Sequence, residues 1–444
     1  MVKQVFQTNS RKRWERFVWT VRFLMTFIIL LLLVFVTMFC MEGSPNMPFH
    51  HDYRGVVSGT KPFMPETHIT KSYRLLRDDF LERRMHNSYQ EHFEKSHRFV
   101  GHGKGVTKKY IDEWTNPSMG VRAAWYVNWD QHSMRSLKQG MKHLNMVIPE
   151  WFFINPTTCK LETRIDKKAL CLLRKSGVPI LPILTNNYGD SFRPEGIGRI
   201  MNNPEMRKRF INSVCSLCSK YHFQGINVDL EELSINDNAL LTNFMKDLSA
   251  SFHDNNMYVT QDIEPFNDDY DVEPLAKFND YLFLMAYDEH NTDSKPGAVS
   301  SQHWVERATD WAAKNIPNDK LVLGLAAYGY DWPDGDKGNT VSFDQTMAAA
   351  LDAGANIIFD DDSYNLSYSY YDDDNLLHDV HFTDAATLFN IMRFGTTYHL
   401  AGFGVWRLGT EDHRLWNFYG KDLSWEKVRK MNVSKLLRLD GYDD

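Results

Sequence analysis

An alternation of polar and apolar residues near the middle of the chain brings two carboxylates onto one face of a predicted strand. Between residues 225 and 232 the polar positions are Asn227, Asp229 and Glu231, and the positions between them are all apolar. Because side chains on a strand alternate between its faces, the three polar residues share one face. Residues two apart on a strand lie about 6.6 Å apart, so two acids there can divide into a proton donor and an anionic partner. The alternative is a solvated strand face, which the wholly apolar opposite face disfavours.

The elements around this strand predict a barrel. From about residue 122 onward, eight short apolar runs alternate with helical patterns. They cover residues 123–128, 146–154, 180–185, 225–231, 258–263, 281–286, 321–327 and 402–408. This alternation predicts an α/β fold, a (β/α)8 TIM barrel. The gap between the last two runs is too long for one crossover, so we expect an insertion between strands 7 and 8, over residues 333–380.

Active sites of such barrels lie at the carboxyl ends of the strands. Every predicted strand here ends in polar or aromatic residues. We therefore expect the fourth-strand acids to meet residues from the ends of the other strands. The candidates for this site are Tyr126, Gln261, Tyr287, Asp288, Tyr328 and Trp406, and all but Tyr287 are expected to bind substrate.

The composition argues against several classes of function. A formal net charge of −7 disfavours a nucleic-acid partner. The five cysteines are too few and too scattered for a disulfide scaffold. None of the 17 histidines falls in a ligand-like cluster at the strand ends, and no glycine-rich phosphate loop follows the first strand. We therefore expect no metal and no cofactor.

An apolar stretch near the N-terminus predicts a membrane anchor. Residues 18–40 are almost entirely apolar and, as a helix, reach about 34 Å, enough to span a bilayer. Basic residues precede this stretch and Glu42 follows it, so the positive-inside rule puts residues 1–17 in the cytoplasm. A cleaved signal peptide is the rival interpretation, but no Ala-x-Ala site follows. We expect a single-pass protein of the cell (inner) membrane with its larger part outside.

Composition also divides the rest of the chain. Residues 41–117 mix proline, histidine, glycine and charges, which is typical of a stalk or linker. Residues 118–420 carry the barrel pattern, and residues 421–444 form a C-terminal tail.

Five motifs follow one another in an order that is typical of one family. QGINVDLE at 224–231 occupies the frame D-G-x-D-x-D-x-E, MAYD at 285–288 fits M-x-Y-D, and LGLAAYGYDW at 323–332 resembles G-x-P-x-Y-G-Y-D-W. HDVHFTDA at 378–385 fits H-x-V-x-F-x-D-A, and GFGVW at 402–406 fits G-x-x-x-W. In these motifs the chain resembles glycoside hydrolase family 18, the family of chitinases and related N-acetylglucosaminidases. It is more narrowly similar to the family-18 domain that precedes deacetylase and family-2 glycosyltransferase domains in bacterial membrane polysaccharide enzymes.

The resemblance implies a retaining, substrate-assisted hydrolysis. Glu231 would protonate the glycosidic oxygen, and the carbonyl oxygen of the sugar's own N-acetyl group would be the nucleophile. Asp229 would orient and stabilise that acetamide, and Tyr287 would hydrogen-bond to it. Trp406 would stack beneath the sugar. The substrate would be a β-linked polysaccharide that contains N-acetylated hexosamine.

Two positions depart from the family's pattern, because Gln224 and Asn227 stand where the family has aspartates. Asn227, which we keep among the catalytic residues, has the size and hydrogen-bonding capacity of aspartate but carries no charge. In the aspartate version this inner carboxylate shares a proton with the next acid. Its loss predicts a more persistently ionised Asp229, because a like charge is gone, and an activity that is reduced or altered rather than abolished.

A function of another class uses the same barrel. A catalytically weak domain would bind carbohydrate and guide an exported polysaccharide beside a synthase. The retained pair Asp229 and Glu231 favours the enzyme, whereas Gln224 and Asn227 favour the binder. The expected partners are a polysaccharide, the membrane through the N-terminal helix, and a polysaccharide synthase or deacetylase.

Overall fold

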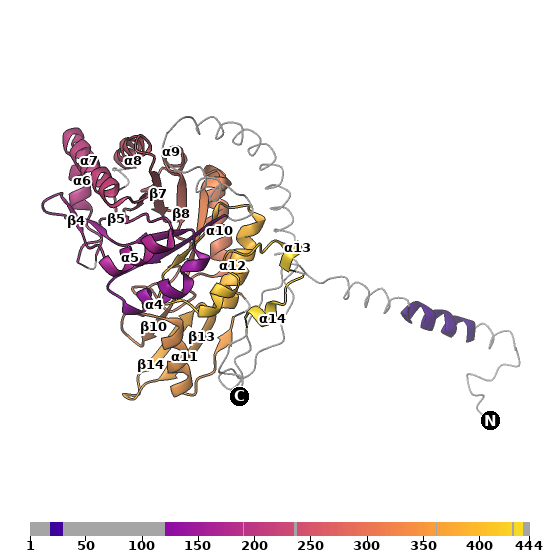
Figure 1. Ribbon diagram of the computed structural model, residues 1–444. Coiled ribbons are helices and arrows are strands. Elements are labelled where there is room, and N and C mark those ends of the chain that lie inside the picture. Colours follow the sequence, from indigo (N-terminus) through magenta and orange to yellow (C-terminus); the bar gives the residue numbers. More distant parts are fainter. Residues whose placement is uncertain are drawn as a thin grey trace, which may run out of the picture. The chain divides into compact units, whose positions relative to one another are not determined.

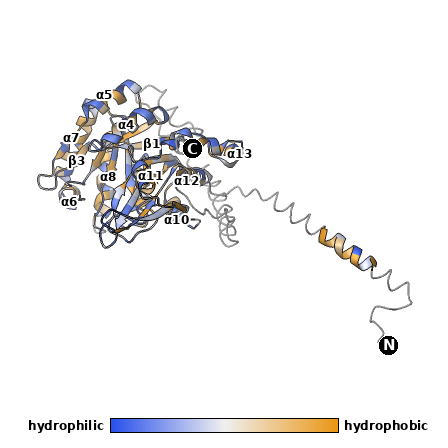
Figure 2. Ribbon diagram, turned by 90° about the horizontal axis from the view of Figure 1, so that it is seen from below, coloured by the Kyte–Doolittle hydropathy of each residue, from blue (hydrophilic) through white to orange (hydrophobic). Residues whose placement is uncertain are grey.

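The computed structural model describes residues 18–29, 120–189, 191–234, 238–360, 362–428 and 430–437. The chain divides into two compact units, Met1–Met47 and Pro48–Asp444. In the first unit, residues 18–29 form a mostly hydrophobic helix (Figure 2). Its large apolar side chains are exposed. Within the described ranges, no helix has both the length and the apolar character needed to cross a membrane. The rest of the predicted anchor, the predicted tail and the predicted stalk, which are residues 30–40, 1–17 and 41–117, lie outside the described residues.

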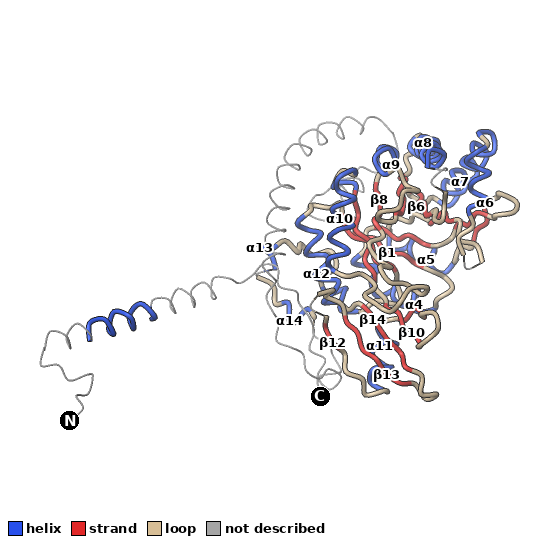
Figure 3. Tube along the Cα trace, turned by 180° about the vertical axis from the view of Figure 1, so that it is seen from behind, coloured by secondary structure: helices blue, strands red, loops and turns tan. Residues whose placement is uncertain are grey.

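A ten-stranded sheet in the second unit curls into a TIM-barrel-like arrangement (Figures 1 and 3). Its order is β2-β1-β15-β9-β8-β7-β6-β5-β3-β4, and every pairing is parallel except that of β4 with β3. Because β2 and β3 follow each other closely in the chain, and Val147 bridges to Ile180, the sheet curls back on itself. The strands are β1 (Val121–Tyr126), β2 (Met146–Pro149), β3 (Phe152–Ile154), β4 (Leu161–Thr163), β5 (Ile183–Thr185), β6 (Gly225–Asp229), β7 (Tyr258–Ile263), β8 (Tyr281–Leu284), β9 (Leu321–Ala326) and β15 (Gly402–Trp406).

All eight predicted strands occur, and their boundaries differ from the prediction by up to three residues. The run predicted as one strand is interrupted at Glu150 and Trp151, which separate β2 from β3. The strand that carries the acids ends at Asp229, so Glu231 lies in the loop that follows. The predicted barrel fold is thus confirmed as a TIM-barrel-like sheet.

Helices follow most of the strands and cover the outer surface of the sheet (Figure 3). Several begin with a side chain that accepts from the first turn, as Asp166 does from Lys168 and Ala169. The helices are α4 (Gln131–Gly140), α5 (Lys167–Ser176), α6 (Pro194–Asn202), α7 (Pro204–Tyr221), α8 (Asn238–His253), α9 (Val272–Phe278), α10 (Gln302–Asn315), α11 (Phe343–Asp352), α12 (Ala385–Thr397), α13 (Trp425–Val428) and α14 (Val433–Leu436), with 3-10 turns η1 (Met141–His143), η3 (Asn318–Lys320) and η4 (His413–Asn417).

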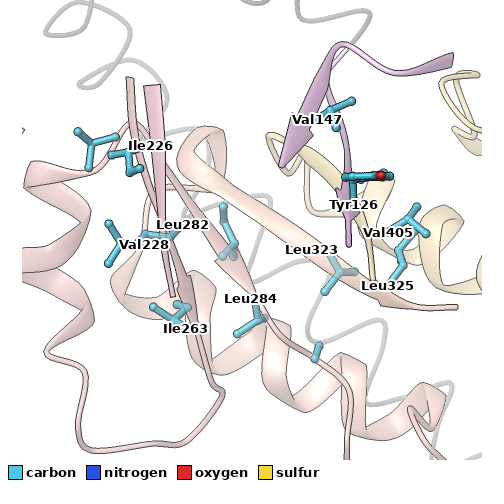
Figure 4. Packing of buried hydrophobic residues seen from close by; sticks show 14 of the residues in the cluster. Tyr126, Val147, Ile226, Val228, Ile263, Leu282, Leu284, Leu323, Leu325 and Val405 are labelled. Atoms are coloured by element: carbon cyan, nitrogen blue, oxygen red, sulfur yellow. The ribbon is translucent and has the colours of Figure 1, made fainter. Parts of the chain in front are cut away.

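Side-chain alternation divides the apolar residues of the strands into two layers. Ile226 and Val228 of β6 point outward and pack in the layer between sheet and helices (Figure 4). Trp125 of β1 and Phe283 of β8 belong to a smaller cluster on the inner face, where their rings meet edge to face at 5.2 Å. This inner cluster fills the barrel interior, and the polar residues that follow on the same face gather at its carboxyl end.

The expected insertion is a lobe between β9 and α12 that contains α11 and a second sheet (Figures 1 and 3). This sheet is antiparallel with the order β11-β10-β14-β13-β12 and has its own apolar core around Phe382. The Tyr- and Asp-rich part of the insertion contributes to β13. The strands are β10 (Gly329–Pro333), β11 (Asn339–Val341), β12 (Ile358–Phe359), β13 (Leu366–Tyr371) and β14 (Leu377–Phe382).

Candidate active site

The inward faces of β6 and β7 carry the polar residues from which the site is built. Asn227 and Asp229 alternate with outward-pointing apolar residues of β6, as the sequence predicted. The parallel register pairs Asn227 with Thr260 and Val228 with the residue after Thr260. Two residues further along each strand, Asp229 and Asp262 therefore lie on the same inward face of neighbouring strands.

Asn227 is fully buried, and both ends of its amide are hydrogen-bonded. Its Nδ2 donates to Oδ2 of Asp262 at 2.6 Å, and its Oδ1 accepts from Oγ1 of Thr260 at 2.6 Å. By contrast, Oδ1 of Asp262 and Oδ1 of Asp229 are buried without a hydrogen-bond partner among the described residues. A buried acceptor left unpaired costs about 1–3 kcal/mol. This part of the barrel therefore holds polar atoms that a core built only for stability would avoid.

Gln224, the other departure from the family's pattern, lies at the opposite end of β6. Its Oε1 accepts from the backbone N–H of Ile180 at 2.9 Å, and its Nε2 donates to the carbonyl of His222 at 2.9 Å. These contacts tie together the chain segments before β5 and β6. The substitution at this position does not reach the acids.

Glu231 follows β6 in a loop whose backbone is held by two neighbouring side chains. The amide of Asn186 accepts from the N–H of Glu231 at 3.0 Å and donates to its carbonyl at 2.9 Å. The hydroxyl of Tyr270 donates to the carbonyl of Leu230 at 2.9 Å. Glu232 then adopts a left-handed φ of 53° and is exposed. The loop therefore fixes Glu231 beside Asp229 and turns Glu232 toward solvent.

The two acids influence each other's protonation. Burial raises the pKa of Asp229 to about 6, against hydrogen bonds from Glu231 and Thr185 that lower it. Burial, followed by the charges of Asp229 and Glu264, raises the pKa of Glu231 well above its usual value. The hydrogen bond between the two carboxyls lowers the pKa of one and raises that of the other, so the shared proton belongs to Glu231. The pKa of Asp229 is nevertheless raised, because burial outweighs the hydrogen bonds from Glu231 and Thr185.

Aromatic side chains form the wall of the site on the side of β8, β9 and β15. Tyr287 is buried and meets the ring of Tyr328 edge to face at 6.3 Å. Oδ1 of Asp288 accepts from the hydroxyl of Tyr328 and, at 2.7 Å, from that of Tyr330. Trp406 packs against both this aromatic group and the inner cluster of the barrel. Asp288 therefore orients tyrosines of the insertion's first strand and the loop before it.

Two of the predicted substrate contacts do not join this group. Gln261 is fully buried, and its Oε1 accepts from Nδ2 of Asn279 at 3.0 Å, at the end of α9. Tyr126 packs in the layer between sheet and helices (Figure 4), and its hydroxyl donates to Asp166 at 2.7 Å. Each of these side chains points away from the barrel interior, and the residue next to it on the strand points inward. A position near the strand end was therefore insufficient to predict a place in the site.

The inward positions on these two strands belong to two residues that were not among the predicted site residues. They are Trp125 on β1, whose ring lies 6.0 Å from that of Trp406, and Asp262 on β7. The alternation of side chains along a strand could have indicated them, since Trp125 lies next to Tyr126 and Asp262 lies next to Gln261. Which of two adjacent residues points inward, however, is decided only by the pairing with the neighbouring strands.

An exposed tryptophan extends the rim of the site beyond the acids. Trp129 is 65% exposed, and its Nε1 donates to Oε2 of Glu150 at 2.8 Å. The guanidinium of Arg407 lies 4.3 Å from the centre of the Trp129 ring and donates to Asp130 at 2.6 Å. An aromatic ring that is exposed yet fixed by polar partners suits stacking against a sugar. In the described ranges, no group of three or more His, Cys, Asp or Glu side chains is arranged to hold a metal ion.

Residues 174–411, more than half of the chain, match the sequence model of the family described as Glycosyl hydrolases family 18. The chain belongs to glycoside hydrolase family 18. The matched range contains the acids Asp229 and Glu231 as well as Tyr287 and Trp406. Family 18 membership supports a glycoside hydrolase that acts on a polysaccharide.

Relatives and solved structures agree with this family. The chain is 26% identical over 305 residues to the uncharacterized glycosylase YvbX of Bacillus subtilis (strain 168), covering 66% of this chain and 88% of that relative. It is 26% identical over 255 residues to the cortical fragment-lytic enzyme of the same organism, covering 53% of this chain and 58% of that enzyme. The crystal structure of a chitinase from Chromobacterium violaceum ATCC 12472 matches with a TM-score of 0.62 at 22% identity, covering 70% of this chain and 98% of that one. The structural match supports the family 18 fold.

Proposed function

We propose that this family 18 protein hydrolyses a β-linked polysaccharide containing N-acetylated hexosamine, with retention of configuration and with help from the substrate's own acetamide. One observation carries the proposal: Glu231 and Asp229 share a proton at the end of β6, and the balance of their pKa shifts leaves it on Glu231. A protonated acid beside an anionic partner is the division of roles that this chemistry requires. The chitinase among the similar structures supports an N-acetylated substrate.

Each residue then has a defined task. Glu231 gives its proton to the glycosidic oxygen as the bond from that oxygen to the anomeric carbon breaks. The carbonyl oxygen of the acetamide attacks the anomeric carbon, while the Asp229 carboxylate accepts from the acetamide N–H and stabilises the positive charge that develops. Tyr287 donates to the same acetamide, and Trp406 stacks under the sugar ring. Water, deprotonated by Glu231, then opens the intermediate from the face that the leaving group occupied.

The test is turnover of a chromogenic N-acetylglucosamine oligomer by the wild type, Glu231→Gln and Glu232→Gln. Removing the proton donor should lower kcat by about 10²- to 10⁴-fold without weakening sugar binding. Glu232 is the matched control, because it is the adjacent carboxylate and faces solvent, and its variant should keep wild-type turnover. Equal, very slow release by the wild type and Glu231→Gln, with sugar binding intact in both, would refute the hydrolase and leave the carbohydrate-binding function.

We also propose that the protein is anchored in the cell (inner) membrane by residues 18–40, with its N-terminus in the cytoplasm and the barrel outside. The apolar stretch and the basic residues before it support this proposal. A barrel so placed would act on polysaccharide beside a synthase or a deacetylase. The full chain should sediment with membranes and be cut by protease added outside, whereas a chain lacking residues 1–40 should be soluble. A full chain that stays in the soluble fraction would contradict the anchor.

A further inference from the structure

We propose that a basic surface formed by α5 and the end of α7 docks on an anionic phospholipid membrane and leaves the mouth of the barrel open to the polymer. The inference rests on the proposed membrane anchor and goes beyond it, because it gives the barrel a lipid contact of its own. We call this surface the basic face. Its cations, which lie around a hollow, are Lys167, Lys168, Arg174, Lys175 and Lys220.

The charge of the basic face is opposite to that of the whole chain. The chain has a formal net charge of −7, whereas α5 carries four basic residues and no acidic one. All five cations of the basic face are exposed, and none of them forms an ion pair in the described part of the chain. By contrast, the exposed ammonium groups of Lys277 and Lys337 pair with acids. A cluster of unpaired charges of one sign attracts a surface of the other sign.

The hollow between the cations has apolar walls that are held in place. Its volume is about 510 Å³, and Leu170 and Tyr221 contribute its apolar part. The ring of Tyr221 stacks on that of Phe223 at 5.6 Å, and its carbonyl accepts from Nη2 of Arg174 at 2.9 Å. A phospholipid surface matches both features, because its phosphate groups pair with cations and its interfacial region accepts tyrosine and leucine side chains. A soluble polyanion would leave the apolar walls uncovered.

The basic face extends to the end of the barrel that lies opposite the acids. Helices α5 and α7 lead into β5 and β6, so their last turns lie at the amino ends of these strands. Arg174, Lys175 and Tyr221 belong to these last turns. Asp229 and Glu231 lie at the carboxyl end of β6 and beyond it. A barrel that rests on a membrane through the last turns of α5 and α7 therefore keeps its mouth accessible to a polysaccharide.

Docking would be an intramolecular step in the anchored chain. Residues 41–117 join the proposed anchor to the barrel, and such a tether raises the effective concentration of the barrel at the membrane. Each Lys or Arg near an anionic membrane then strengthens the contact about fivefold. Because the attraction is between exposed charges, salt should weaken it.

The exposed thiol of Cys171 lies in the hollow and reports on the contact. The full chain, carrying Cys40→Ser and Cys159→Ser, is reconstituted in vesicles of phosphatidylcholine alone or of phosphatidylcholine with phosphatidylglycerol. The rate at which a membrane-impermeant maleimide modifies Cys171 is measured on both, while Cys215 and Cys218 are buried. We expect the rate to be at least about tenfold lower on the vesicles with phosphatidylglycerol. The difference should disappear in about 1 M salt.

Two matched variants test whether the charge of the basic face causes this difference. Lys168→Gln/Lys175→Gln removes two exposed cations of α5 and should reduce the difference between the lipids to less than about threefold. Lys246→Gln/Lys295→Gln changes the net charge equally at exposed positions elsewhere and should keep the full difference. Both variants should keep the wild-type turnover of the chromogenic oligomer, which shows that they are folded.

A displaced reporter tests whether the protection is local. Cys171→Ser/Asp373→Cys moves the thiol to the exposed turn between β13 and β14 of the insertion. This thiol should react at the same rate on both lipids. A thiol at residue 373 that is slowed as strongly as Cys171 would overturn the proposal, because the whole barrel, and not the basic face, would then be covered.

Other results would also overturn the proposal. They are equal rates for Cys171 on the two lipids, equal behaviour of the two double lysine variants, and slowing by soluble polyphosphate without slowing by phosphatidylglycerol, which would indicate an anionic polymer. A failure of the anchor is a separate result, in which the wild type would not sediment with phosphatidylcholine vesicles. The wild type should then still sediment with phosphatidylglycerol vesicles, and Lys168→Gln/Lys175→Gln should not. A chain that sediments with neither would refute both proposals.

Discussion

Two groups of buried carboxyls in this molecule differ in the charged and hydrogen-bonding partners of their oxygens. In the acid cluster, defined as Asp229, Glu231 and Asp262, the strongest electrostatic neighbours are other acids, and two oxygens lack a hydrogen-bond partner in the described ranges. In the paired cluster, defined as Asp384, Asp412 and Arg414, the guanidinium donates to Asp412 at 2.5 and 3.0 Å and lies 3.5 Å from Asp384.

The paired cluster joins structural elements, whereas the acid cluster faces the mouth of the barrel. Asp412 also accepts from the first N–H of α12, and Asp384 accepts from Thr387 one turn later. Every one of these contacts would be lost on unfolding, so the paired cluster stabilises the fold. The acid cluster instead holds like charges at a cost, which is typical of a site arranged for proton transfer. Buried aspartates therefore stabilise the fold where a cation pairs with them. Where their neighbours are other acids, they are available for proton transfer.

Removing the cation of the paired cluster should have the largest effect. Arg414→Met leaves two buried carboxylates without their shared partner, and we expect the free energy of unfolding to fall by about 3–5 kcal/mol. Denaturant unfolding measures this change. Arg135→Met, which removes an exposed arginine of α4, is the control and should alter stability by less than about 0.5 kcal/mol. Turnover per folded molecule should be unchanged, and a loss of turnover larger than the loss of folded protein would show that the paired cluster also contributes to catalysis.

Removing a charge from the acid cluster should raise the free energy of unfolding rather than lower it. Asp229→Asn should raise the free energy of unfolding at neutral pH by about 1–3 kcal/mol, because a carboxyl whose pKa is raised to about 6 no longer has to ionise inside the protein. The same variant should lose most of its turnover. A destabilised Asp229→Asn would show that the acid cluster, like the paired one, contributes to stability.

The stability that Asp229→Asn gains should depend on pH. Unfolded aspartate titrates near about 3.9, and the folded pKa of Asp229 is raised to about 6. The folded state therefore binds this proton more tightly, so its contribution to stability is complete below pH 4 and is lost as the pH rises through 6. The difference in melting temperature between Asp229→Asn and the wild type should be small at pH 4 and should grow up to pH 7. A difference that shrinks over this range would contradict the raised pKa.

A single neutral hydrogen bond near the acid cluster should have the smallest effect. Tyr270→Phe removes the hydroxyl that donates to the carbonyl of Leu230, and we expect a loss of about 1 kcal/mol in the free energy of unfolding. Because Glu231 follows directly, kcat should fall by a few-fold while KM stays close to the wild-type value. Unfolding curves and steady-state kinetics measure the two effects. An unchanged kcat would mean that Asn186 alone is sufficient to hold the loop.

Much of the fold was visible in the sequence because strand and helix patterns are local. The eight strands and the position of the insertion were predicted from apolar periodicity and from loop length. The pairing of Asp229 with Glu231 was predictable for the same reason, since both lie on one short segment. Gln261 and Tyr126 were predicted to lie in the site, but their side chains point away from it. The direction of a side chain depends on the pairing with the neighbouring strand, which is not a local property.

The motifs of the sequence predicted a barrel of family 18 type and placed two acids, two residues apart, at the carboxyl end of its fourth strand. Only the tertiary structure decided which residues of other strands meet them. A shift of one residue in the phase of a strand sends its side chain to the opposite face, and this phase is set by the register of neighbouring strands in the curled sheet. For that reason Asp262, and not Gln261, stands beside Asp229, and the substitution at Asn227 acquires a partner that the β6 motif does not contain.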